Sequence, residues 1–177
     1  MIVMGVDGSL GSTGIAVATP ERVIALTKIR TAKTKKTPTE SARLRQIYEE
    51  FSQLLRFYQP TAVVMENQHI VNQRTGNPQT GMSLSRVRGV IQVVCALHGI
   101  PFYLYEPTQI KKLVTGKGNA SKEQVQQSVI QLYQHESIVT STLSKIVLTG
   151  KDKTDDMADA LALVHAYLTA PEIAVSS

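Results

Sequence analysis

Tryptophan is absent from this chain of 177 residues, and only 5% of its residues are aromatic. Stacking on a nucleic-acid base would therefore have to come from tyrosine, phenylalanine, histidine or arginine. Cys95 is the only cysteine, which excludes a disulfide within the chain and fits a reducing compartment. No apolar run approaches the length of a membrane span, and the first residues read as a strand and not as a charged leader. We therefore expect no membrane partner, no signal peptide and a cytoplasmic location.

Zinc-type spacing is also missing, because the four histidines do not form a tight ligand pattern. What the chain has instead is positive charge: 19 lysines and arginines against 14 acidic residues give a formal net charge of +5. Such an excess favours a polyanionic partner, and nucleic acid is the simplest one. Charge alone fits a merely basic soluble protein equally well.

The hydrophobic content of 42% and the chain length predict one globular domain. The apolar pattern predicts a three-stranded meander over residues 2–29, strands over 61–66 and 101–105, and helices from about 39 and over 82–97, 107–115, 121–133 and 154–170. Residues 67–80 are predicted to be a loop, and residues 134–153 have no assignment. This order predicts the α/β class, with a mixed central sheet that begins with an antiparallel meander and is flanked by helices. We expect one domain over residues 1–170 and a flexible C-terminal tail over 171–177.

Four acidic residues sit where a metal-dependent nuclease would need them. Asp7 and Glu66 each end an apolar strand, and Asp156 and Asp159 lie on the first turns of the last helix. Carboxylates at the ends of core strands are costly unless something pairs with them. A pair of Mg²⁺ ions, which prefer hard oxygen ligands, is the natural shared partner. Taken singly, each carboxylate has an ordinary alternative as a turn cap, a helix cap or the partner of a lysine.

Basic residues gather in two further regions. Four lysines lie within twelve residues around a glycine-rich turn: Lys111, Lys112, Lys117 and Lys122. They suit contacts with phosphates, or they belong to the solvated surface of a pair of helices. The loop after Glu66 carries His69 and Arg74, which can stack on a base or belong to a surface loop. Arg86 and Arg88 lie on different faces of the helix 82–97, so we expect one to contact the nucleic acid and the other to support a dimer contact.

The helix 82–97 is apolar around more of its surface than one stripe. Its apolar residues are Met82, Leu84, Val87, Val90, Ile91, Val93, Val94 and Leu97. A helix of this kind is buried on more than one side. We expect one side to pack on the sheet and another side to pack on a partner subunit.

These segments, in this order, resemble the RuvC-type Holliday-junction resolvases of the RNase H-like superfamily. The first motif of that family is similar to GVDGSLGSTG at residues 5–14, the second to VME at 64–66, and the last to DMADALA at 156–162. Residues 86–90, 109–111 and 118–125 resemble its intervening helix and its basic segments. The chain differs from the family pattern at Gly8, where proline is frequent, and at His69, where an aromatic side chain is usual.

The resemblance implies a metal-dependent, structure-selective endonuclease that resolves four-way DNA junctions by paired nicks, acting as a homodimer. It implies that two Mg²⁺ ions per active site, or Mn²⁺ in their place, are held by Asp7, Glu66, Asp156 and Asp159. The resemblance also implies that Lys122 is a catalytic residue and that Lys111 is a second basic residue near the scissile phosphate. Branch-migration machinery is a further expected partner.

Three other functions fit parts of the sequence. The first is a junction-binding protein that does not cleave, and the second is a ribonuclease H-like nuclease acting on RNA or on RNA–DNA hybrids. The third is an actin-like or sugar-kinase-like ATPase, which would need a second, larger half to hold ATP. A chain of 177 residues leaves little room for that half.

Overall fold

The computed structural model describes residues 1–32, 34–35, 39–67, 78–143 and 156–176. Within them, one sheet has the strand order β3-β2-β1-β4-β5-β6. Its strands are β1 Val3–Asp7, β2 Ser12–Ala18, β3 Val23–Arg30, β4 Ala62–Glu66, β5 Phe102–Tyr105 and β6 Val175–Ser176. The helices are α1 Glu40–Tyr58, α2 Pro78–Leu97, α3 Pro107–Thr115, α4 Lys122–Leu132, α5 Ser137–Thr142 and α7 Asp156–Thr169, followed by the 3-10 helix η1 Pro171–Ile173.

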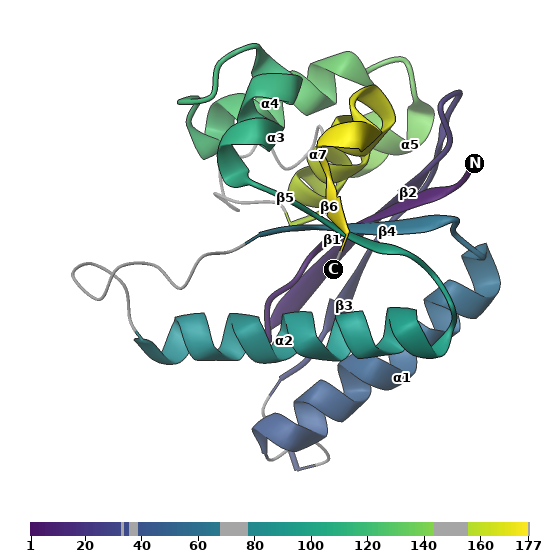
Figure 1. The fold of residues 1–177 in the computed structure, drawn as a ribbon, viewed down its shortest axis with the longest axis vertical. Helices are drawn as coiled ribbons and strands as arrows, with labels where there is room; N and C mark the ends of the chain where they lie inside the picture. Colours follow the sequence, from purple (N-terminus) through teal and green to yellow (C-terminus); the bar gives the residue numbers. More distant parts are fainter. Residues whose placement is uncertain (33, 36–38, 68–77, 144–155, 177) are drawn as a thin grey trace.

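The sheet is mixed, as the sequence predicts. Strands β1, β2 and β3 form the predicted antiparallel meander, whereas β1 pairs with β4, and β4 with β5, in parallel. Helices α1 and α2 cover one face of the sheet, and α3, α4, α5 and α7 lie on the other (Figure 1). The prediction of an α/β fold is therefore confirmed. Because β1 and β4 run in parallel, the acidic residues that end them lie at the same edge of the sheet.

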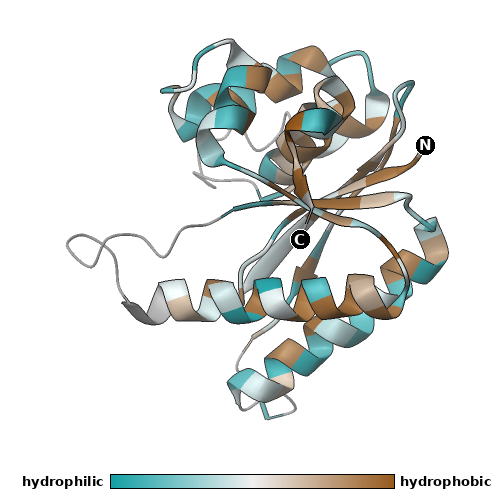
Figure 2. Cartoon of the chain, in the orientation of Figure 1, coloured by the Kyte–Doolittle hydropathy of each residue, from teal (hydrophilic) through white to brown (hydrophobic). Residues whose placement is uncertain are grey.

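The two faces of the sheet carry side chains of different size. Alternation along a strand sends successive side chains to opposite faces. On the face that α1 and α2 cover, β1 and β2 carry large apolar residues: Met4, Val6, Ile15 and Val17. These residues form one core cluster with buried residues of both helices. Cys95 belongs to this cluster as a small core residue, and burial raises the pKa of its thiol to about 12. Figure 2 shows the apolar side of both helices turned toward the sheet.

Small residues on the other face let α7 approach the sheet closely. A Cβ atom on Gly5 would lie 2.1 Å from the carbonyl oxygen of Ala160, and one on Gly14 would lie 2.1 Å from that of Asp156. Neither distance is possible for a real side chain, so only glycine permits this contact. The helix thus lies directly over β1 and β2, with its first turn next to the strand end that carries Asp7.

Helix α7 is buried on more sides than a single stripe. Its buried residues include Ala158, Ala162 and Leu163 in addition to Leu161 and Val164. The reason is that α3 and α4 pack against the side of α7 that faces away from the sheet. Tyr105 on β5 anchors its far end, since the Tyr105 hydroxyl donates a 2.6 Å hydrogen bond to the carbonyl oxygen of Ala170.

Three segments differ from the sequence prediction. Helix α2 begins at Pro78, inside the range predicted to be a loop, because proline suits the first turn of a helix. The unassigned range contains helix α5, which buries Val139. Beyond residue 170, where the sequence predicts a flexible tail, η1 is followed by β6, which pairs antiparallel with β5 and covers an otherwise open sheet edge. The domain boundary at residue 170 stays a prediction. In the described part of the chain, no helix is long and apolar enough to span a membrane.

The close contact between α7 and the sheet can be tested by substitution of Gly14. Gly14→Ala would force a methyl group against the main chain of Asp156, and we expect a loss of about 1–3 kcal/mol in the free energy of unfolding. The control is Gly81→Ala, since a Cβ at Gly81 has no atom within 4 Å and alanine favours a helix. Urea unfolding measures both. Equal stability of Gly14→Ala and the parent would contradict the contact.

Candidate metal centre

Three carboxylates from two distant parts of the chain meet at the edge of the sheet. Asp7 ends β1, while Asp156 and Asp159 stand three residues apart on the first turn of α7. One carboxylate oxygen from each can be chosen so that all three lie within 4.8 Å of one another. All three side chains are partly buried. This is the grouping that the sequence predicts for these residues.

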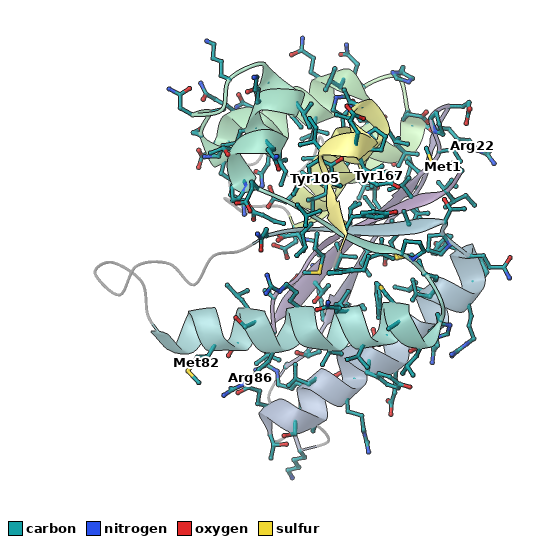
Figure 3. All side chains as sticks on the ribbon, viewed as in Figure 1. Met1, Arg22, Met82, Arg86, Tyr105 and Tyr167 are labelled. Atoms are coloured by element: carbon teal, nitrogen blue, oxygen red, sulfur yellow. The ribbon has the colours of Figure 1, made fainter. Side chains whose placement is uncertain are left out.

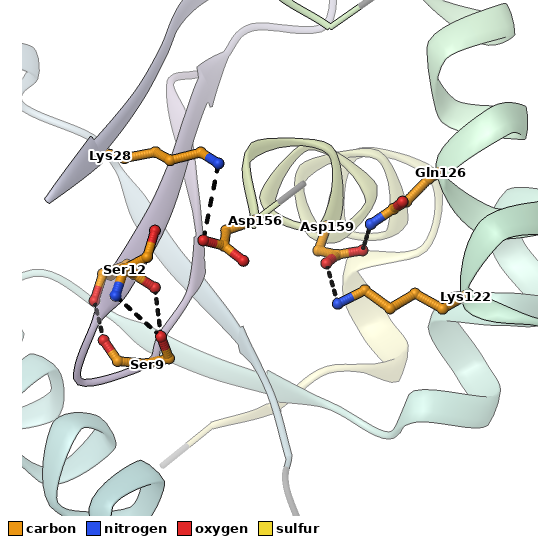
Figure 4. Close-up of polar contacts among 8 residues, drawn as sticks. Ser9, Ser12, Lys28, Lys122, Gln126, Asp156 and Asp159 are labelled. Atoms are coloured by element: carbon orange, nitrogen blue, oxygen red, sulfur yellow. Dashed lines mark hydrogen bonds and ion pairs between the residues drawn. The ribbon is translucent and has the colours of Figure 1, made fainter. Parts of the chain in front are cut away.

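A row across the meander explains how Asp156 reaches the group. Asp7 on β1 lies opposite Gly14 on β2, and Gly14 lies opposite Lys28 on β3. Directly opposite residues of antiparallel strands point to the same face. The missing side chain of Gly14 leaves the space that the main chain of Asp156 occupies. Lys28 then approaches from the far side, with its Nζ atom 3.9 Å from Oδ2 of Asp156 (Figure 4).

Asp159 is held by two side chains of α4. Lys122 places its Nζ atom 2.7 Å from Oδ2 of Asp159, and Gln126 donates a 3.0 Å hydrogen bond from Nε2 to Oδ1. Figure 4 shows the carboxylate between these two donors. Helix α4 starts at Lys122 because Ser121 caps it, with the Ser121 hydroxyl accepting a 3.2 Å hydrogen bond from the amide of Gln124. The cap therefore places the lysine at the helix end that faces the carboxylates.

A cleft opens beside this group. Acidic, basic and apolar residues line it: Asp7, Glu66, Pro107, Ile110, Lys111, Lys122, Val125, Asp159, Ala162 and Leu163. Glu66 thus borders the same cleft, although the tight group of three does not include it. The four predicted metal ligands and the two predicted catalytic-site lysines therefore gather in one place.

The carboxylates oppose one another's ionisation. The pKa of Asp7 is raised to about 7, mainly by burial and next by the charge of Asp159, although the charge of Lys122 lowers it. Burial likewise raises the pKa of Asp159, against the hydrogen bonds and charge from α4 that lower it. The pKa of Lys122 is raised, because contact with Asp159 outweighs the lowering effect of burial. Even with Lys122 beside Asp159 and Lys28 near Asp156, the pKa of Asp7 stays raised, so the residues fit a divalent cation with hard oxygen ligands.

The other residues that the sequence predicts to contact DNA lie outside the cleft lining or outside the part of the chain that the structure describes. Lys112 and Lys117 are exposed on α3 and on the turn after it, beyond the cleft lining. Arg86 forms an ion pair with Glu40 of α1, with 2.8 Å from its Nη1 atom to Oε1. His69 and Arg74 fall among the residues that the structure does not describe. DNA contact by any of these residues stays a prediction.

A hydrogen-bonded chain that the sequence did not predict fastens the end of β4. Asn67, directly after Glu66, donates a 2.6 Å hydrogen bond from Nδ2 to Oε1 of Glu106 and accepts a 3.1 Å one from Nη1 of Arg88. Glu106 is the N-cap of α3, the helix that carries Lys111. The position of Glu66 is thereby tied to α2 on one side and to α3 on the other.

Lys28, Gln126 and Asn67 are the site residues that sequence reasoning missed. For Gln126 a signal existed, because it stands four residues after Lys122 and so shares its helix face. For Lys28 the contact depends on strand register, and for Asn67 on the neighbour relation of β4 and β5. Neither can be read from a local pattern.

Comparison with known proteins gives consistent results. The family model described as crossover junction endodeoxyribonuclease RuvC matches residues 3–166. The crossover junction endodeoxyribonuclease RuvC of Alkaliphilus metalliredigens is 34% identical over 175 residues, covering 94% of this chain and 93% of that protein. The protein of the same name from Chlamydia muridarum is 37% identical over 130 residues, covering 72% of this chain and 68% of its own.

Solved structures show the same fold. RuvC of Thermus thermophilus, in complex with a Holliday junction substrate, matches with a TM-score of 0.79 at 22% identity, over 100% of this chain and 99% of its own. The yeast mitochondrial Holliday junction resolvase matches with a TM-score of 0.64 at 16% identity, over 94% and 77%. The family model covers most of the chain, and the Alkaliphilus relative is similar almost from end to end. The chain therefore belongs to the RuvC family of crossover junction endodeoxyribonucleases.

Proposed function

We propose that this chain resolves four-way DNA junctions as a metal-dependent endonuclease, with Asp7, Glu66, Asp156 and Asp159 as the metal ligands. The observation that carries the proposal is the meeting of three partly buried carboxylates within 4.8 Å, beside a cleft that two lysines line. Membership of the RuvC family supports junction DNA as the substrate. The predicted cytoplasmic location and branch-migration partner belong to the same proposal.

Two divalent ions, Mg²⁺ or Mn²⁺, would supply an activated water and stabilise the leaving oxygen of the phosphodiester. The residues of the chain would position the carboxylates and bring positive charge to the phosphates. The close contact of β1 and α7 at Gly5 fixes the main chain of both elements, and so the separation at which Asp7 and Asp159 stand. Lys122 brings a positive charge to the cleft, where it can neutralise charge that builds on the phosphate during cleavage. Lys111, on the same cleft, can hold the neighbouring phosphate.

The exposed lysines extend this binding surface. Lys112 and Lys117 lie on α3 and on the turn between α3 and α4, next to the helices that line the cleft. Phosphate contacts of this kind position DNA without reading its sequence. The proposal therefore assigns them to affinity and not to the chemical step.

A homodimer would suit a two-fold symmetric junction, because each of two sites could then cut one strand. One side of α2 packs on the sheet through Val87, Ile91 and Val94. The other side leaves three apolar side chains open: Met82 is 53% exposed, Val93 55% and Leu97 67%. Figure 3 shows Met82 extending from α2 away from the sheet. We propose that this outer side of α2 is the dimer surface.

The test of function is a cleavage panel in Mg²⁺ with a four-way junction, a duplex, an RNA–DNA hybrid and a single strand. We expect paired nicks in the junction and little cutting of the other substrates. Asp7→Asn should reduce junction cleavage by more than the roughly 100-fold that loss of an outer partner of a metal ligand causes. Junction binding should persist, because affinity comes mainly from lysines on phosphates.

Two results would contradict this proposal. If the parent protein binds the junction but does not cleave it in Mg²⁺ or in Mn²⁺, the chain is a junction-binding protein and not a nuclease. Preferential cutting of the RNA–DNA hybrid would identify a ribonuclease H-like enzyme instead.

A comparison of variants at Lys122 and Lys112 tests which lysine acts in the chemical step and which acts only in DNA binding. Single-turnover cleavage at saturating enzyme should fall about 10²-fold for Lys122→Ala, since a charge that stabilises the developing negative charge is lost. Lys112→Ala is the matched control on the neighbouring helix, and it should cut at the parent rate once bound. A salt titration should show a shallower dependence of affinity for Lys112→Ala. Parent-rate cutting by saturated Lys122→Ala would exclude its catalytic role.

The dimer surface is tested by charge on α2. Val93→Lys would place two like charges near a two-fold axis, so we expect the protein to shift from dimer to monomer in analytical ultracentrifugation at micromolar concentration. Leu132→Lys is the control, because Leu132 is a similarly exposed apolar residue, at 46%, on α4. A parent protein that is already a monomer, or a Val93→Lys variant that remains a dimer, would refute the assignment.

A further inference from the structure

Gln126 is a polar side chain in an otherwise apolar interior. Among the described residues, only four polar side chains are buried, and Gln126 is one of them at 8% exposed. A buried amide costs free energy unless it is hydrogen-bonded. Its Nε2 atom donates a 3.0 Å hydrogen bond to Oδ1 of Asp159. Because a carboxylate only accepts, the amide must turn its N–H group toward it.

Gln126 and Lys122 reach the same carboxylate in different ways. They stand four residues apart on one face of α4, which packs against α7. Lys122 contacts Oδ2 with a side chain that is 45% exposed and lines the cleft. Gln126 contacts Oδ1 from the buried side and is not part of the cleft lining. Asp159 is therefore contacted by one side chain that lines the cleft and by one that is buried in the core.

We propose that Gln126 is a positioning residue that fixes the rotation of the Asp159 carboxylate, so that one of its oxygens stays turned toward Asp7 and Asp156. This inference rests on the proposed metal site. The terminal torsion of an aspartate is broad, so α7 alone does not determine how the plane of the carboxylate is rotated about its bond. A donor fixed in the core removes that freedom. Lys122 cannot serve in this way if its charge is shared with a phosphate, whereas Gln126 lies outside the cleft lining.

A purely structural role makes a different prediction. If Gln126 only joined α4 to α7, a methionine of similar size would fill its place, and the metal affinity of the site would not change. If Gln126 orients Asp159, the same substitution leaves the carboxylate free to turn and weakens metal binding. Outer partners of this kind are typically worth 10- to 100-fold in metal affinity.

The experiment titrates the whole protein with Mn²⁺ in the absence of DNA and follows free Mn²⁺ by electron paramagnetic resonance. Gln126→Met should bind Mn²⁺ about 10-fold more weakly than the parent. Gln127→Met is the control, since Gln127 is the exposed neighbour on the same helix, and it should bind as the parent does. Thermal unfolding without metal shows whether each variant is folded. If Gln126→Met does not fold, Gln126→Asn replaces it, because the shorter amide no longer reaches Asp159 and should weaken binding in the same direction.

A double-mutant cycle shows whether the effect passes through Asp159. In an Asp159→Asn background, Gln126→Met should cause no further loss of Mn²⁺ affinity. An equal loss in both backgrounds would overturn the positioning role, as would parent-like affinity in the folded Gln126 variant. A parent protein that binds no Mn²⁺ is a separate result, which removes the proposed metal site and this inference with it.

Discussion

The contact between α7 and strands β1 and β2 is the constraint on which the site depends. Two glycines make it possible, since any side chain at Gly5 or Gly14 would collide with the main chain of the helix. A helix held this close cannot slide or turn without losing its packing. Its first turn therefore stands above the end of β1, and the carboxylates of α7 meet Asp7 at a fixed separation. The asymmetry of the sheet follows the same logic, with small residues under α7 and large ones under α1 and α2.

That rigid frame holds together groups that repel one another. Burial and neighbouring carboxylates raise the pKa of Asp7 to about 7, which shows that bringing these charged acids together costs electrostatic free energy. Packing energy from the apolar face of α7 opposes this repulsion, and α4 reduces it by bringing a positive charge and an amide donor to Asp159. A site that is costly for its protein without a cation is the kind of place where function is expected. The clustered carboxylates therefore favour a positively charged partner.

Much of this arrangement could be predicted from the sequence, because it rests on local patterns. Apolar runs ending in Asp7 and Glu66 indicated strands with carboxylates at their ends, and the spacing of Asp156 and Asp159 placed both on one helix face. The meander followed from the same periodicities. The order of the motifs indicated the RuvC family, which the family model confirms. Helix α5 and strand β6 were not predicted, since short elements carry too few residues to show a period. The early start of α2 was not predicted either, because its first four residues include no large apolar side chain.

The sequence by itself determined which residues are acidic, basic or apolar and on which elements they stand. Only the tertiary structure decided which of them meet. The row from Asp7 through Gly14 to Lys28 exists because of strand register, and a one-residue slip would turn every side chain to the other face. The contact of Gln126 with Asp159 exists because α4 packs on α7, although 33 residues separate them in the chain. Contacts between distant segments depend on how whole elements pack, and no local pattern of residues records that.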